Sequence, residues 1–533
     1  MIDLLVIGSG GAGLSAAITA KEQGANVLVV TKQHPTHAGT SQAQGGINGV
    51  LSFELDSVEQ HIEDTIKAAH GLADEKSVEL MCGKAKESIE WLDSIGVPFS
   101  RNEENQIAQR KFGGGKFDRT CYSSDYTGLK ILHTLYDRCI KDDIEFLNEH
   151  LLLNLIVEGD IALGATFLDI LTGEVKQILA KTTILATGGY AGIYNGYTTN
   201  SSASTGDGVT SALRAGCRLS NMEFIQFHPT ALKNSKVLIS ESARGEGGYL
   251  VNSEGDRFVD ELLPRDIVAR AIYDQMNKNK EVFLDIRHLG LDKINKLMPQ
   301  EKELAKIFED VDVENQLIPI SPVAHYSMGG IKTDIDTKTN IKNLFACGEC
   351  AEAGVHGANR LGGNSLLEIV TFGRISGSQA IKSSLGVTIE DKEYEKYAKD
   401  KEYIDSIYKM PNQINFYHKK DEIGELFYNK LGLYRDEKKI ESLISYIDKC
   451  KDESKNMGIG DKSKEYNQNL VEFLEFQNIL ELSELILKNA LYRKESRGAH
   501  FRLDYPDEEN IYQDSSISYI YDNDIVVNIG NEI

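Results

Sequence analysis

Continuous apolar runs alternate with stretches of helical character in the first half of the chain. Residues 2–7 form one such run, a glycine turn and an alanine-rich stretch follow it, and residues 26–30 form a second run. Further runs lie at residues 151–157, 162–169 and 182–185. Strands that are buried on both faces are apolar throughout, and strands that alternate with helices form parallel sheets. The pattern therefore predicts an α/β domain of the Rossmann type.

Helical spacing of apolar residues predicts helices in other parts of the chain. We expect two helices between residues 57 and 92 and one at residues 129–141. Residues 392–494 are rich in Lys, Glu, Asp, Tyr and Leu, and an apolar stripe at residues 471–486 favours about three antiparallel helices there. Alternation of apolar and polar residues at 516–529 predicts a hairpin.

Between residues 223 and 324 the pattern changes to short strands and loops around one clear helix, at residues 264–277. Glycine-rich, Rossmann-like sequence then returns. We therefore predict a Rossmann-like α/β domain with an inserted α+β capping domain, followed by a C-terminal helical bundle and a short β tail. The predicted boundaries are 1–222 and 325–391 for the two parts of the Rossmann-like domain, 223–324 for the capping domain, 392–495 for the helical domain and 496–533 for the tail.

Composition narrows the location and the partners. The 533 residues include 58 Lys and Arg against 81 Asp and Glu, a net charge of −23, which argues against a nucleic-acid partner because phosphate binding needs clustered basic residues. Seven cysteines, spread from Cys82 to Cys450, are more typical of reduced thiols than of a disulfide framework. The first strand begins at residue 2 with no charged and apolar segment before it, so we expect no cleaved signal peptide, and no apolar run is long enough to span a bilayer. We expect no direct membrane insertion and a cytoplasmic location, either free or on the inner face of a membrane through a partner.

The glycine turn Gly8-Ser9-Gly10-Gly11-Ala12-Gly13 fits the spacing G-x-G-x-x-G, and it lies between the first strand and the first helix. In this pattern glycines let the chain turn sharply, let the backbone approach a pyrophosphate and let the helix pack on the strand. The helix N-terminus then offers free N–H groups and a positive dipole end to the phosphates. The turn predicts a dinucleotide site.

Several other stretches are more polar and richer in glycine than their surroundings. They are Gln44-Gly45-Gly46, Phe112-Gly113-Gly114, His228-Pro229-Thr230, Glu241-Ser242-Ala243-Arg244-Gly245-Glu246-Gly247-Gly248, Pro264-Arg265-Asp266, His325-Tyr326-Ser327-Met328-Gly329-Gly330 and the segment from His356 to Glu368. In this order and spacing, the chain resembles the flavoprotein subunits of succinate dehydrogenase and fumarate reductase, and their close relative L-aspartate oxidase, from residue 2 to about Asp504.

The resemblance implies that the cofactor is FAD. The residues that it implies as FAD contacts are Gly8, Gly10, Gly11, Ala12, Gly13, Thr31, Lys32, Thr40, Ser41, Gln44, Gly45, Gly46, Ala186, Thr187, Gly188, Asp207, Glu349, Ser365 and Leu366. In most membrane-complex members a histidine five residues before the glutamine of Q-G-G is bonded covalently to the flavin. Counting back from Gln44 gives Gly39, with His37 two positions out of register. We therefore expect non-covalent FAD, which favours fumarate reduction or a substrate that is easier to oxidise than succinate.

The resemblance also implies a four-carbon dicarboxylate, fumarate or succinate, as substrate. The positions that match its binding site are Phe112, His228, Ser240, His325, Arg360 and Gly363. Arg265, Glu241 and Arg244 match a proton relay, in which Arg265 protonates the substrate carbon next to the one that receives hydride from flavin N5. An arginine has a pKa above about 12 and is a poor acid. The alternative interpretation of these three residues is a structural ion network.

L-aspartate oxidase, which makes iminoaspartate for NAD biosynthesis, is the main alternative function, and Gly39 fits it. These oxidases typically carry an acidic residue within R-E-G-G-H that meets the substrate ammonium, whereas this chain has Phe112 there. An ammonium buried beside phenylalanine without a partner costs several kcal/mol. A non-enzymatic flavin-binding electron-transfer module is a second alternative, against which the presence of Arg265, Arg360, His228 and His325 argues.

The cysteines predict no metal or iron–sulfur site. Cys347 and Cys350 form one C-x-x-C pair, which cannot complete a tetrahedral zinc site by itself and falls inside the FAD motif. The remaining cysteines lack iron–sulfur spacing. Electrons therefore have to reach or leave the flavin through a separate protein, such as an iron–sulfur subunit, or through a small redox molecule.

Overall fold

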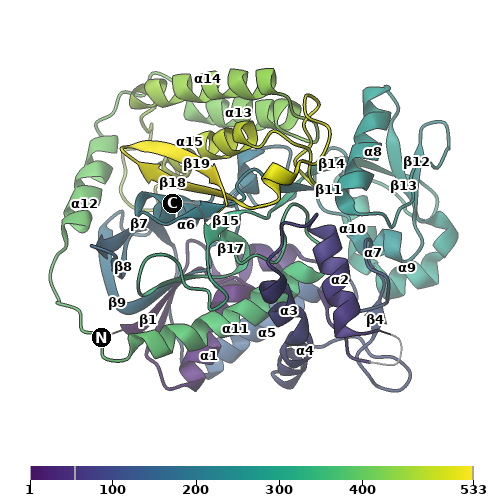
Figure 1. Ribbon diagram of the computed structural model, residues 1–533, viewed down its shortest axis with the longest axis horizontal. Coiled ribbons are helices and arrows are strands. Elements are labelled where there is room, and N and C mark those ends of the chain that lie inside the picture. The colour runs from purple at the N-terminus through teal and green to yellow at the C-terminus, as the bar shows by residue number, and fades with distance from the viewer. Residues whose placement is uncertain (1, 53–55, 531–533) are drawn as a thin grey trace.

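The computed structural model, which describes residues 2–52 and 56–530, contains a seven-stranded sheet whose labelled strands lie at the left of Figure 1. Its strands are β1 (Ile2–Ile7), β2 (Val27–Val30), β6 (Glu145–Leu147), β7 (His150–Glu158), β8 (Ile161–Asp169), β9 (Val175–Leu185) and β16 (Leu344–Ala346). β1 pairs in parallel with β2 and β9, β6 and β16 extend this parallel part, and β7 and β8 add to β9 as an antiparallel meander. Leu4, Leu5 and Val6 are fully buried, which explains the continuous apolar run. Residue 1 and residues 531–533, at the ends of the first and last predicted segments, lie outside the described residues.

The packing of two helices, far apart in the sequence, determines the edge of this sheet at which a ligand can bind. α1 (Gly11–Glu22) and α11 (Asn364–Ser384) pack against each other along the sheet, at the bottom of Figure 1. A Cβ on Gly373 would lie 2.5 Å from Ala12 O, and one on Gly377 would lie 2.3 Å from Ala16 O, so these backbones approach too closely for any larger residue. The contacts advance in the same direction along both helices. Both N-termini therefore point to the edge where β1 ends.

The segment between β2 and α6 contributes helices and a small sheet. Three helices occupy residues 58–94, where the sequence predicted two: α2 (Val58–Ala68), α3 (Glu75–Gly83) and α4 (Ala85–Ser94). Lys84 alone separates α3 from α4, and apolar spacing continues through it, which is why periodicity did not reveal the break. The other elements are β3 (Ile47–Asn48), β4 (Gln109–Arg110), β5 (Thr120–Cys121), α5 (Thr127–Lys141) and α6 (Asp207–Arg214).

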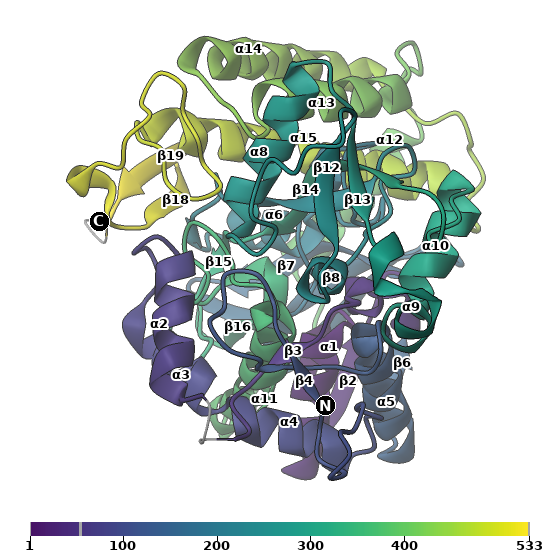
Figure 2. The same ribbon diagram turned by 90° about the vertical axis from the view of Figure 1, so that its right-hand side faces the viewer.

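The capping segment has its own antiparallel sheet and apolar core, at the right of Figure 1 and facing the viewer in Figure 2. Its elements are β11 (Ile225–Leu232), α7 (Glu241–Gly245), β12 (Tyr249–Asn252), α8 (Arg265–Asn277), β13 (Val282–Asp285), α9 (Leu291–Leu297), α10 (Pro299–Glu309) and β14 (Ile318–Ser327). The sequence predicted one clear helix here, α8, and the structure adds α7, α9 and α10. These are short helices whose apolar faces are completed only by packing on the sheet.

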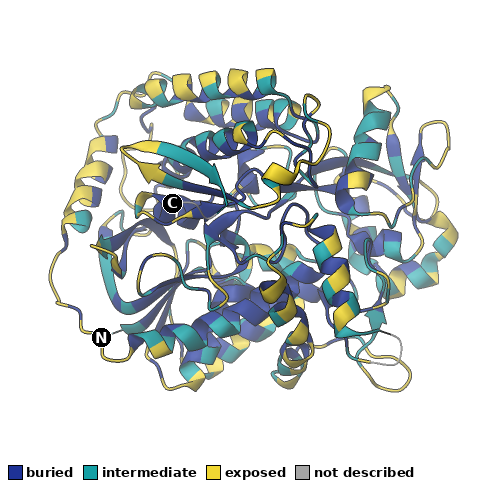
Figure 3. Cartoon of the chain, in the orientation of Figure 1, coloured by how far each residue is buried: buried dark blue, intermediate teal, exposed yellow. Residues whose placement is uncertain are grey.

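Four helices, where the sequence predicted about three, form the C-terminal bundle: α12 (Glu395–Ile407), α13 (Phe416–Lys430), α14 (Glu437–Glu453) and α15 (Gln468–Tyr492). Figure 3 shows exposed residues on the outer faces of α12 and α14. The predicted hairpin is present as β18 (Ser516–Tyr521) and β19 (Asp524–Ile529), and it joins β10 (Leu219–Ser220), β15 (Gly330–Lys332) and β17 (Ala351–Glu352) in a five-stranded sheet. Within residues 2–52 and 56–530, no helix has both the length and the apolar character required to cross a membrane.

Candidate active site

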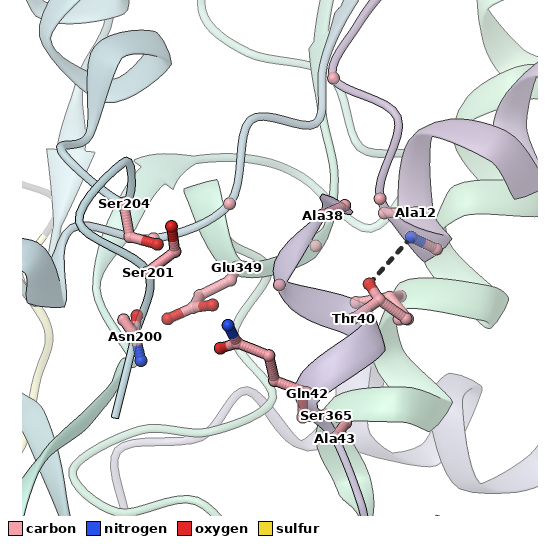
Figure 4. Close-up of a pocket in the computed structure, with 18 of the residues that line it drawn as sticks. Ala12, Ala38, Thr40, Gln42, Ala43, Asn200, Ser201, Ser204, Glu349 and Ser365 are labelled. Atoms are coloured by element: carbon pink, nitrogen blue, oxygen red, sulfur yellow. Dashed lines mark hydrogen bonds between the residues drawn. The ribbon is translucent and has the colours of Figure 1, made fainter. Parts of the chain in front are cut away.

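A cavity of about 280 Å³ extends from the end of β1 to the capping segment. Its walls come from the glycine turn, from residues 30–46, from the loops after β9 and β16, and from the start of α11. Strands β11 and β14 and helices α7 and α8 close the other end. Figure 4 shows the first of these ends, with the Glu349 carboxylate between Asn200 and Gln42. The cavity therefore joins a nucleotide-like cradle to a polar chamber beneath the capping segment.

The glycine turn forms the cradle. Gly8 has a φ of +110°, and a Cβ there would lie 2.2 Å from Ala186 O, while a Cβ on Gly13 would lie 2.0 Å from Gly8 O. The protein itself therefore requires these two glycines. Gly10 differs, because its Cβ would meet nothing closer than Thr40 Oγ1 at 3.5 Å and the residue lines the cavity. The lack of a side chain at Gly10 therefore leaves space for a ligand and is not required by the packing of the protein itself.

Two histidines meet edge to face in the polar chamber, with ring centroids 5.0 Å apart. His228 lies on β11 and His325 on β14, and the pairing of these two strands is irregular around both residues. Such bulges redirect side chains. Thr230 N donates to His228 Nδ1 at 3.2 Å, while Thr199 Oγ1 lies 2.7 Å from His325 Nδ1. Burial, and next the positive charge of Arg265, hold the pKa of both imidazoles well below 6.5, so both are neutral at pH 7.

Two arginines enter the same chamber from different elements. Arg265 begins α8 and donates to Glu241 Oε2 from Nε at 2.8 Å and from Nη2 at 2.6 Å. Its Nη1 donates to Gln226 Oε1 at 3.0 Å, and Arg360 Nη2 donates to the same oxygen at 3.2 Å. Burial, and next Arg265, lower the pKa of Arg360 to about 10. Arg265 and Arg360 carry two positive charges, and the carboxylate of Glu241 balances one of them. The chamber therefore keeps a positive charge that favours the binding of an anion.

A third arginine lies behind Glu241. Arg244 is fully buried, its Nη2 lies 3.8 Å from Glu241 Oε1, and its Nη1 donates to Glu261 O at 2.6 Å. Burial lowers the pKa of Arg244, whereas Arg265 and Arg244 together lower the pKa of Glu241 although burial opposes this. Arg265, Glu241 and Arg244 thus form a continuous row of charged groups that runs inward from the chamber.

The comparisons with known proteins identify the family. The model described as FAD binding domain matches residues 3–366, and the one described as fumarate reductase flavoprotein C-term matches residues 420–529. The fumarate reductase flavoprotein subunit of Haemophilus influenzae is 35% identical over 96% of this chain and 90% of its own length. The succinate dehydrogenase flavoprotein subunit of Rickettsia bellii is 37% identical over 95% of this chain and 91% of its own length. The chain belongs to this flavoprotein family.

A solved structure supports the same assignment and the fold. An FrdA mutant of E. coli quinol fumarate reductase superimposes with a TM-score of 0.94 at 33% identity, over 99% of this chain and 96% of that chain. The predicted fold class, a Rossmann-like FAD-binding domain with a capping domain and a C-terminal helical region, is thereby confirmed. The exact domain boundaries remain predictions.

The cofactor of this flavoprotein is FAD, and the cavity fits it. Gln44 Oε1 and Thr187 Oγ1 line the cavity and are buried without a hydrogen-bond partner among the described residues. Buried polar atoms usually have partners, so a ligand with polar groups is expected here. Burial raises the pKa of Glu349 to about 7, and Ser327 donates to its Oε1 from N and Oγ. The protonated carboxyl of Glu349 can donate to a ligand oxygen.

The predicted residues of this flavoprotein differ in how they meet the cavity. All predicted substrate positions line it, as do Arg265 and Glu241 and most predicted FAD contacts. Gly13, Ser41 and Arg244 lie outside the wall: Gly13 lets α1 pack on β1, and Ser41 Oγ donates to Ala38 O. Lys32 lines the cavity, but its Nζ already donates to Asp207 at 2.6 Å and to Glu475 at 2.7 Å.

Sequence reasoning missed several residues of the site. Gln226 bridges the two arginines and Thr199 contacts His325, while Asn200, Ser201 and Ser204 line the cradle. Gln226 directly precedes the Phe227-His228-Pro229-Thr230 stretch, so alternation along β11 could have revealed it. The residues at 199–204 lie in a polar loop without a pattern, and no signal in the sequence marks them.

Proposed function

We propose that this chain interconverts fumarate and succinate, with FAD as its redox cofactor and fumarate reduction as the favoured direction. The observation that carries the proposal is the convergence of Arg265, Arg360 and two neutral histidines on one chamber at the end of the FAD cavity. A dicarboxylate needs several fixed donors, and these four side chains supply them from three separate elements and a loop. When bound, FAD would supply the hydride for fumarate or accept it from succinate.

The chain's own residues bind and orient the substrate. Arg360 can clamp one carboxylate through two parallel donors, since its Nε is buried without a partner among the described residues. The ring of Tyr326 lies 4.1 Å from the Arg360 guanidinium and helps to fix its plane. His228 donates from Nε2 in the tautomer that the Thr230 N–H bond to Nδ1 favours, and His325 and Ser240 complete the contacts.

We assign the proton transfer to Arg265. Its Nε and Nη2 are held by Glu241 Oε2, which leaves Nη1, the nitrogen shared with Gln226, to deliver the proton to the substrate carbon. Glu241 Oε2 then returns a proton to the guanidinium, and Arg244 supplies Glu241 from the inside. Burial lowers the pKa of Arg244, so the proton that Arg244 supplies to Glu241 is less costly to release than in water.

We propose that FAD is held without a covalent bond. Gly39 lines the cavity, and a Cβ there would meet nothing within 4 Å, so the position has room for a side chain. Glycine has none, and this position therefore cannot form a covalent bond to the flavin. A non-covalent flavin favours reduction of fumarate over oxidation of succinate. Electrons would then come from a separate partner, such as an iron–sulfur subunit, which could also hold the chain on the inner face of a membrane.

Phe112 is the argument against L-aspartate oxidase. It is buried against Gly45 beside the chamber, where those oxidases have an acidic residue. The carboxylate of Glu241, which accepts from Gly113 N next to Phe112, is already engaged by Arg265. A substrate ammonium would therefore be buried without a partner, at a cost of several kcal/mol.

The test is turnover by the purified protein with FAD bound, using reduced methyl viologen as the electron donor. We expect fumarate to be reduced to succinate with two viologens oxidised for each fumarate. Maleate is the control, because it carries the same carboxylates in the cis geometry, and it should turn over far more slowly. No fumarate turnover despite bound FAD would refute the proposal, and release of hydrogen peroxide from L-aspartate would favour the oxidase.

A further inference from the structure

Two buried carboxyl groups join the capping segment to the Rossmann-like part of the chain. Asp125 precedes α5, Glu301 lies in the first turn of α10, and both residues are fully buried. Asp125 Oδ2 accepts from Gln300 N at 2.7 Å and from Glu301 N at 3.1 Å. Asp125 thus satisfies free N–H groups at the start of a helix that belongs to the other part of the molecule.

Glu301 in turn holds the helix that carries the proposed relay. Ser242 Oγ donates to Glu301 Oε1 at 2.8 Å. Ser242 lies on α7 directly after Glu241 and two residues before Arg244. α7 has five residues and cannot fix its own orientation by backbone bonds alone. The bond from Ser242 therefore connects the orientation of Glu241 and Arg244 to the side chain of Glu301.

The other oxygen of Glu301 can find a partner only if it carries a proton. Glu301 Oε2 is buried, and no N–H or O–H group among the described residues donates to it. The carboxyl group of Asp125 lies within hydrogen-bonding distance of Glu301. Burial, and then the negative charge of Asp125, raise the pKa of Glu301 well above its usual value, and burial also raises the pKa of Asp125. Two carboxyl groups this close share a proton rather than both ionise.

The other charged and titratable groups around Asp125 and Glu301 do not remove the need for a shared proton. Arg110, on β4, is a cation whose field reaches Glu301, but its Nη2 donates to Gly45 O and Ser124 O instead. The field of Glu246, just after α7, acts on Arg110, and the fields of Asp125, Glu303 and Glu301 act on Tyr126 in the loop before α5. The acidic groups around the pair disfavour a second negative charge.

We propose that Glu301 is a positioning residue that acts as a neutral carboxylic acid, donating its proton to Asp125 and accepting from Ser242, and that it thereby sets the orientation of α7. This inference rests on the proposed function, because Glu241 and Arg244 on α7 form the relay to Arg265. When the shared proton leaves at alkaline pH, the two carboxylates repel, the contact between the capping segment and Asp125 weakens, and fumarate reduction slows.

Because the pKa of Glu301 is raised in the folded chain, the free energy of unfolding falls as the pH rises. The folded chain binds a proton at Glu301 that the unfolded chain has released at neutral pH, so this group's contribution to stability is present below the unfolded pKa and is lost as the pH rises through the folded pKa. Glutamine has the same shape as the neutral acid, with an amide that can donate to Asp125 and an oxygen that can accept from Ser242. It cannot lose a proton.

Glu301→Gln and Glu301→Ala, compared with wild type, test the inference. We expect Glu301→Ala to lower kcat for fumarate by about tenfold to a hundredfold with little change in KM, because a misplaced relay slows proton transfer without removing the substrate contacts. Glu301→Gln should restore most of that loss and should flatten the fall of kcat on the alkaline side of neutrality. Glu303→Gln, an exposed position on the same helix, is the matched control and should keep the wild-type profile.

Thermal unfolding of the FAD-bound protein gives a second measurement that needs no turnover. The Tm of wild type should fall more steeply than that of Glu301→Gln as the pH rises above 4.5, the usual pKa of a glutamate. Equal steepness, or an alkaline fall of kcat in Glu301→Gln equal to that of wild type, would overturn the inference. If wild type has no fumarate turnover but the Tm difference is present, the proposed function fails while the shared proton of Asp125 and Glu301 stands.

Discussion

Replacing Arg265 with alanine is the sharpest test of the proposed chemistry. The change removes the donors to Glu241 Oε2 at 2.6 and 2.8 Å and the donor to Gln226 Oε1 at 3.0 Å. Glu241 then keeps Gly113 N at 2.8 Å and Arg244 at 3.8 Å as its remaining partners. The substitution therefore has two separable effects, the loss of a proton donor and the loss of charge balance at a buried carboxylate.

The magnitudes of the two effects can be worked out separately. A positioned general acid contributes about 10²–10⁴ in rate, so kcat for fumarate should fall by at least that factor. Breaking a buried ion pair by removing one partner costs about 3–5 kcal/mol of folding free energy. Adding Glu241→Gln removes the carboxylate that has lost Arg265, but it also takes from the buried Arg244 its carboxylate partner at 3.8 Å. The double variant should therefore regain only part of the stability and none of the activity.

The assay combines turnover with reduced methyl viologen, FAD content by absorbance, and unfolding by urea. Arg287→Ala is the control, because Arg287 lies in the capping segment with a side chain that is 44% exposed and pairs with Asp285. We expect Arg265→Ala to keep its FAD and to lose fumarate reduction, while Arg287→Ala keeps both. Near-normal turnover by Arg265→Ala would refute its role as the acid, and would support the interpretation of these residues as a structural ion network.

The remaining predictions concern the cofactor and the choice of substrate. Acid precipitation should release all of the yellow colour into the supernatant, because Gly39 offers no attachment point, and colour left in the pellet would contradict this. Gly10→Val should give a folded protein without FAD, since its Cβ meets no protein atom closer than 3.5 Å, whereas Gly13→Val should unfold the turn; far-ultraviolet circular dichroism and FAD absorbance distinguish the two. Phe112→Glu should raise KM for fumarate by placing a negative charge beside the dicarboxylate, and an unchanged substrate profile would remove the main argument against L-aspartate oxidase.

Local patterns in the sequence predicted elements well where burial is uniform. The strands at residues 2–7 and 27–30 and the hairpin at 516–529 correspond closely to predicted segments. A short apolar run bounded by turn residues indicates a strand buried on both faces, and a strict alternation indicates a strand with one buried face. Asp522 and Asn523 adopt φ values of 49° and 63°, which Asp and Asn tolerate in a tight hairpin turn. The short helices α9 and α10 were missed, because their stability comes from packing on the capping sheet.

The motifs indicated the residue types of the site, but their mutual arrangement came from packing. Arg265 and Glu241 are 24 residues apart in the chain and 2.6 Å apart in space, because α7 and α8 meet beneath the same sheet. Gln226, which bridges the two arginines, belongs to no charged motif, and the strand pairing of β11 with β14 brings it to them. Asp125 and Glu301, separated by 176 residues, form a shared-proton pair that no local pattern could suggest.

The sequence by itself determined the glycine turn, the flavoprotein resemblance and the absence of a histidine at Gly39, because each depends on residue identity at a fixed local spacing. The tertiary structure alone decided which side chains share the chamber, that His228 and His325 are neutral, and that Gly10 faces the cavity while Gly13 faces the protein. These depend on burial and on charges brought together from distant parts of the chain, and neither quantity exists until the chain has folded.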